Sequence, residues 1–106
     1  MYPSLDSLEK RNGTIGFEPI TTIQINGDEW TIGYGYAGKT KGRFNDGLCV
    51  YAKKRIIINR RRVCSLLDVL AHEIIHARVP DLSETAVNDT AELIAKAYHD
   101  FDKRGS

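Results

Sequence analysis

The chain has 106 residues, with 15 lysines and arginines, 14 aspartates and glutamates, three histidines and two cysteines. This length suits one domain, residues 1–106, and excludes a two-domain protein. No apolar run approaches the ~18–20 residues that cross a bilayer. Two cysteines are too few for a disulfide scaffold, and Met1–Asp6 lacks the basic start and apolar stretch of a signal peptide. We therefore expect a cytoplasmic protein with reduced thiols and no membrane segment.

The net charge of +1 conceals an uneven distribution along the chain. Lys39–Arg62 contains nine basic residues and one acid, whereas Asp81–Asp102 contains six acids and one base. A basic segment of this kind can bind nucleic acid or an acidic protein. Its lysines and arginines can equally keep a sheet edge from pairing with other chains. Both interpretations remain open at this point.

The first half of the chain predicts a short helix and then a β-hairpin. Ser4–Asn12 has the pattern of a helix that a following glycine ends. Apolar residues then alternate with polar ones in Ile23–Ile25 and Trp30–Ile32, and Asn26-Gly27-Asp28 lies between these runs as a hairpin signal. Gly33–Gly47 is polar and contains several glycines, which predicts a loop.

The second half predicts two more strands followed by two helices. Leu48–Ala52 and Arg55–Asn59 are apolar runs, and β-branched residues in the second favour a strand. Ser65 is a suitable cap for one helix, Pro80 ends it, and Ser83 caps the next. The prediction is an α+β fold with a small, mostly antiparallel sheet, then a first helix and a second C-terminal helix. The two helices have apolar faces formed by Leu67, Leu70, Ile74 and Ala77, and by Val87, Ala91, Ile94, Tyr98 and Phe101.

The first of these helices carries the motif His72-Glu73-Ile74-Ile75-His76. Two histidines four residues apart lie on one face of a helix, where their imidazoles can bind one zinc ion. Glu73 lies about 100° round the helix from His72, close enough to accept a proton from a metal-bound water. This is the arrangement of zinc peptidases. The alternative is a half-exposed helix with two surface histidines and no metal.

A zinc site of this type needs a third protein ligand. The turn at Pro80 is short, so the second helix begins close to His76, and Glu84 lies near its start beside the apolar face. We therefore predict Glu84 as the third ligand, with Asp81 in the turn as the alternative. Asn88, one turn later on the same face, can hydrogen-bond a ligand.

The motif, followed by an acid early on the next helix, resembles the gluzincin class of zinc metallopeptidases. It is most similar to the small single-domain minigluzincins and to phage and bacterial zincin-like proteins, over about residues 20–100. The resemblance implies zinc on His72, His76 and Glu84, with Glu73 as general base. It also implies that a sheet edge binds the substrate as an added strand. Leu82 stands where metzincins have a third histidine, which disfavours that class.

Two functions follow from these residues. The first is a zinc-dependent metallopeptidase that acts on peptides or proteins. The second is a zinc-containing binding module with little catalysis, which uses the basic 39–62 surface for nucleic acid or an acidic protein. Glu73 favours the first, because a purely structural zinc site needs no glutamate beside its water. We interpret Tyr34, Tyr36 and Tyr51 as packing residues.

Overall fold

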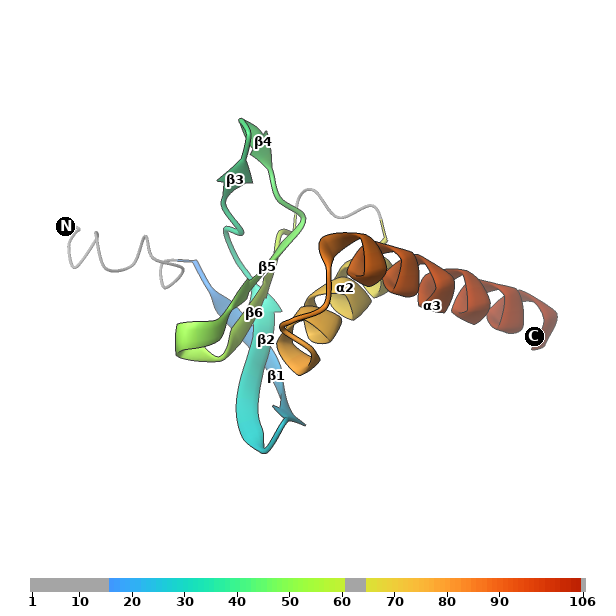
Figure 1. Ribbon diagram of the computed structural model, residues 1–106, viewed down its shortest axis with the longest axis horizontal. Coiled ribbons are helices and arrows are strands. Elements are labelled where there is room, and N and C mark those ends of the chain that lie inside the picture. The colour runs from blue at the N-terminus through green and yellow to red at the C-terminus, as the bar shows by residue number, and fades with distance from the viewer. Residues whose placement is uncertain (1–15, 61–64, 106) are drawn as a thin grey trace.

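A computed structural model describes residues 16–60 and 65–105 (Figure 1). It has the predicted α+β fold, in which a four-stranded sheet of order β1-β2-β6-β5 is followed by two helices. The predicted helix Ser4–Asn12 lies outside the described residues. The elements of the sheet and the helices are β1 (Glu18–Ile25), β2 (Asp28–Tyr34), β5 (Gly47–Val50), β6 (Arg55–Ile58), α2 (Leu66–Arg78) and α3 (Glu84–Gly105).

The β1–β2 hairpin forms where the sequence predicts it. Asn26 and Gly27 have φ angles of 52° and 86°, as a type I′ turn requires. The Asn26 side-chain amide donates to the Arg78 carbonyl at 3.0 Å, and the Arg78 guanidinium donates to Asn26 Oδ1 at 2.7 Å. The tip of the hairpin is therefore tied to the last residue of α2.

One face of the sheet packs against α2 and forms the core. Because side chains alternate along a strand, every second residue of β1, β2 and β6 points to this face. The buried residues of this cluster are Ile25, Trp30, Ile32, Ile56, Ile58 and Ala77, with Val69, Leu70 and Ile74 of α2 packed against it. Burying each large apolar side chain contributes about 1.5–3 kcal/mol. This packing fixes the position of α2 on the sheet.

The segment 33–47, which the sequence predicts as a loop, contains a small second hairpin. Its strands are β3 (Lys39–Thr40) and β4 (Arg43–Phe44), and Lys41 and Gly42 turn with φ angles of 53° and 79°. The loop prediction was wrong here because Lys-Gly is a weaker signal for a type I′ turn than Asn-Gly. The hairpin stands out from one end of the sheet (Figure 1).

The strand predicted over Leu48–Ala52 ends earlier in the structure. β5 stops at Val50, and Tyr51–Lys53 form a 3-10 helix, η2. Lys54 then reverses the chain with a φ of 51°. The joining turn is therefore longer than the predicted Lys53-Lys54, and it carries Tyr51 out of the strand.

The apolar face predicted for α3 is covered only in part. Val87 and Ala91 of this face are buried, as is Ala95, whereas Ile94, Tyr98 and Phe101 are 43%, 55% and 80% exposed. The reason is length, because α3 has 22 residues and α2 has 13. The second half of α3 therefore projects beyond the rest of the molecule (Figure 1). Within 16–60 and 65–105, no helix has the length and apolarity that crossing a membrane would require.

Candidate metal centre

The N-terminal ends of both helices are capped as the sequence predicts, and these caps help to position the candidate ligands. Ser65 Oγ accepts from the Asp68 amide at 3.4 Å at the start of α2. Ser83 Oγ accepts from the Ala86 amide at 3.2 Å at the start of α3. The cap at Ser83 makes Glu84 the first residue of α3, in agreement with its predicted place near the start of the helix. Glu84 therefore lies directly after the turn, opposite the face of α2 that carries the histidines.

The structure brings His72, His76 and Glu84 together. The two Nε2 atoms of the histidines are 3.1 Å apart. One Glu84 carboxylate oxygen lies 3.2 Å from His72 Nε2, and the other lies 3.1 Å from His76 Nε2. Both histidine side chains are 21% exposed, and that of Glu84 is 65% exposed. Three groups that could ligate a metal ion therefore converge at the surface end of a partly buried site.

These separations suit a zinc ion. Zn²⁺ bonds of about 2.0–2.1 Å in a tetrahedron place neighbouring ligand atoms about 3.3 Å apart. The two histidine Nε2 atoms, 3.1 Å apart, approach this value, and each lies 3.1–3.2 Å from one of the two Glu84 carboxylate oxygens. One ligand atom from each of the three residues lies within 4.8 Å of the other two. Two imidazoles and one carboxylate are also a donor set that zinc prefers. In the part of the chain that the structure describes, the group comprises these three residues, which leaves a fourth position for water.

Glu73 is the buried acid of the site, with only 6% of its surface exposed. Burial, together with the smaller effect of the negative charge of Glu84, raises the pKa of its carboxyl to about 7. A cation held by the neighbouring ligands would oppose both effects. Glu73 therefore sits in the low-polarity environment that strengthens a carboxylate as a base.

Gly47 makes room for Glu73. A Cβ atom on Gly47 would lie 2.8 Å from Val69 Cγ1 and 3.0 Å from Glu73 Cγ. These distances are shorter than ordinary contacts between carbon atoms. A glycine at the start of β5 thus lets α2 approach the edge of the sheet, and it lets the Glu73 carboxylate lie against that edge. In the sequence, Gly47 is recognisable only as the end of a predicted loop.

Gly47→Ala is expected to destabilise the protein by about 1–3 kcal/mol, because the added methyl group overpacks the contact between β5 and α2. Urea unfolding of the two proteins measures the difference. Val69→Ala removes the nearest atom, so the double variant should lose less stability than the sum of the two single variants. Additive losses would show that the methyl group on Gly47 does not meet Val69.

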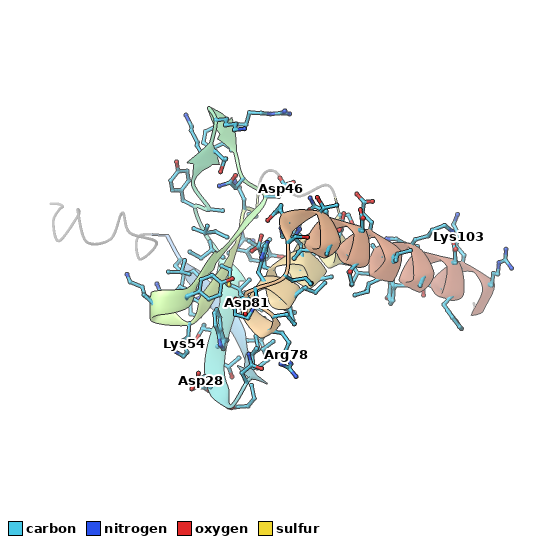
Figure 2. The ribbon with its side chains drawn as sticks, viewed as in Figure 1. Asp28, Asp46, Lys54, Arg78, Asp81 and Lys103 are labelled. Atoms are coloured by element: carbon cyan, nitrogen blue, oxygen red, sulfur yellow. The ribbon has the colours of Figure 1, made fainter. Side chains whose placement is uncertain are left out.

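A cleft runs along β5 beside the three candidate ligands. We use this name for the depression lined by Thr40, Asn45, Gly47, Leu48, Cys49, Tyr51, His72, Glu73, His76 and Glu84. A second hollow adjoins it at His72 and Glu73 and also includes Asn88. No hydrogen bond joins Asn88 to Glu84 among the residues described, so Asn88 borders the site without supporting that ligand. Asp81 lies in the exposed turn before α3 and is not part of the ligand group (Figure 2).

Tyr51 supports the end of α2 that carries His76. In a regular helix the His76 carbonyl would accept from the amide four residues later, but that residue is Pro80, which has no N–H. The Tyr51 hydroxyl takes its place and donates to the His76 carbonyl at 2.9 Å. The Tyr51 ring also packs edge-on against Trp30, with the ring centres 6.0 Å apart. The proline four residues after His76 is the signal that sequence reasoning missed.

Tyr51→Phe is expected to lower the free energy of unfolding of the metal-free protein by about 1 kcal/mol, because it leaves the His76 carbonyl without this donor. Chemical unfolding in the presence of a chelator measures the loss. Tyr36→Phe is the matched control, since the Tyr36 ring packs against Phe44 and its hydroxyl has no hydrogen bond to any residue described. Equal effects of the two variants would contradict the role given to Tyr51.

Comparisons of the chain with protein-family profiles, curated proteins and solved structures found no match.

Proposed function

We propose that the protein is a zinc-dependent metallopeptidase of gluzincin type that hydrolyses peptide bonds. The observation that carries this proposal is the convergence of His72, His76 and Glu84 beside the buried carboxylate of Glu73. A structural zinc site does not require a buried carboxylate beside its ligands. The reducing state expected for the two cysteines makes the cytoplasm the place of action in this proposal.

Each residue of the site has a defined role in this reaction. His72, His76 and Glu84 would hold zinc, which polarises the scissile carbonyl and acidifies a bound water. Glu73 takes the proton from the attacking water and delivers it to the leaving amine. Burial of Glu73 keeps bulk water from competing for that proton.

β5 is suited to hold the substrate. It is the edge strand of the sheet, so one row of its amide and carbonyl groups faces outward into the cleft. An extended peptide can pair with these groups as an added strand. Such pairing would place a peptide bond of the substrate alongside Glu73, because Gly47 of β5 lies against that side chain.

Two measurements on the purified full chain test the proposal. Protein purified without chelator should contain one zinc ion per chain by metal analysis. It should cleave a peptide library, lose this activity with a chelator and regain it with added zinc. Absence of any transition metal would refute the proposal, and bound zinc without cleavage would favour the binding module instead.

A further inference from the structure

The β3–β4 hairpin contributes Thr40 to the lining of the cleft, and its two faces differ. Side chains that lie opposite each other in an antiparallel pair point to the same face. Lys39 pairs with Phe44, and the Lys39 Nζ lies 4.6 Å from the centre of the Phe44 ring. The Tyr36 ring packs on the same Phe44. This face of the hairpin is thus occupied by its own side chains.

The other face of the hairpin belongs to the cleft. Thr40 lines the cleft together with the metal-ligating residues, and Thr40 pairs with Arg43. Arg43 therefore projects from the side of the hairpin that borders the cleft. Its side chain is long enough to extend from this position over an occupant of the cleft.

The base of the hairpin is held firmly. The Asn45 amide donates to the Gly38 carbonyl at 2.9 Å, and the Asn45 side chain donates to the Ala37 carbonyl at 3.1 Å. The Asn59 side chain donates to the Asn45 carbonyl at 3.1 Å, which joins the hairpin to the end of β6. Ala37 is fully buried. Arg43 is therefore presented from a fixed support and not from a free loop.

Among the residues described, the cations of segment 39–60 are spread over different parts of the sheet. Lys54 lies beside Asp28 at the opposite end of the sheet, 3.9 Å between the charged groups (Figure 2), and Arg60 pairs with Glu18. Among the residues described, Arg43 and Lys41 have no acidic partner. A nucleic acid would favour a continuous basic stripe that follows its phosphates. Two unpaired cations two residues apart, on a hairpin whose Thr40 lines the cleft, instead suit a single anionic side chain.

We propose that Arg43 is a specificity-determining residue that binds an aspartate or glutamate side chain of a peptide lying along β5. The guanidinium forms paired hydrogen bonds with a carboxylate, and the charge of Lys41 adds to the attraction. The inference rests on the proposed function, because it assigns the substrate class of the same site: peptides with acidic residues near the scissile bond.

Peptide binding by the zinc-loaded Glu73→Gln protein tests the inference without cleavage. The probes are fluorescent peptides of equal length with glutamate, lysine or alanine at alternate positions, and the readout is fluorescence anisotropy. The glutamate peptide should bind tightest, and adding Arg43→Glu should weaken it about five- to tenfold with little change for the alanine peptide. Lys103→Glu is the matched control, with the same change in net charge at the far end of α3 (Figure 2).

Three outcomes would overturn the inference. In the first, Arg43→Glu leaves the affinity for the glutamate peptide unchanged. In the second, Lys103→Glu weakens binding as much as Arg43→Glu does, which would show that the affinity depends only on the total charge of the protein. A single-stranded oligonucleotide that binds more tightly than the peptide, in an Arg43-dependent way, would assign the hairpin to nucleic acid. Failure of the proposed function is distinct: Arg43-dependent peptide binding would persist while the unmodified zinc-loaded protein cleaves nothing.

Discussion

His76→Ala is expected to weaken zinc binding by roughly a hundredfold or more, because it removes one of three protein ligands. His76 Nε2 lies within about hydrogen-bond distance of both other ligands, 3.1 Å from His72 and 3.1 Å from Glu84. No other histidine among the described residues can replace it, since His72 and His76 are the two histidines of the candidate ligand group. Competition with a chromophoric chelator measures the affinity.

The same variant should lose the stabilisation that zinc provides. A ligand at a thousandfold excess over its dissociation constant stabilises the native state by about 4 kcal/mol. Thermal unfolding with and without zinc should therefore show a large increase in Tm for the unmodified protein and little for His76→Ala. His99→Ala is the control, because His99 is exposed on α3. A variant His76→Ala that binds zinc as tightly as the unmodified protein would contradict the assignment.

Glu73→Gln is expected to retain zinc and to lose peptide cleavage by about 10²–10⁴-fold. The amide has nearly the shape of the carboxylate, so the packing against Gly47 is kept, but it cannot accept the proton of the attacking water. Zinc content and the rate of cleavage are measured on the same preparation. Loss of cleavage with full zinc content distinguishes a general base from a metal ligand.

The control for this second prediction is Glu92→Gln. Glu92 lines the hollow that adjoins the cleft, is exposed, and lies outside the ligand group. The Glu92→Gln protein should retain both its zinc and its cleavage activity. Cleavage that survives Glu73→Gln would remove Glu73 from the mechanism, and loss of zinc in that variant would mean that its side chain supports the ligands directly.

The parts of the site that follow from local rules could be predicted from the sequence. The four-residue spacing of His72 and His76 determines their common face on any helix. Ser83 and Pro80 define a short turn, and a short turn must bring the next acid, Glu84, back towards α2. Caps, turns and helix faces depend on residues close in the chain, and so does the Asn26-Gly27 hairpin.

The contacts that complete the site depend on residues far apart in the chain. The sequence does not reveal that β5 lies at the edge of the sheet, because this requires β6 to pair in parallel with β2. Only that order brings Gly47 against Glu73 and the Tyr51 hydroxyl to the His76 carbonyl. The direction in which the Arg43 side chain points could not be predicted either. Its segment is predicted as a loop, and side chains do not alternate between two faces in a loop.

The uneven covering of α3 creates a gradient of local stability along one helix. Its buried residues Val87, Ala91 and Ala95 all lie within the first 12 of its 22 residues. Backbone amides around these residues should exchange with solvent slowly, whereas those near Phe101 open with little loss of packing. Glu84, the proposed third ligand, is thus attached at the packed end. Fraying of the free end can proceed without disturbing the group proposed to hold the metal.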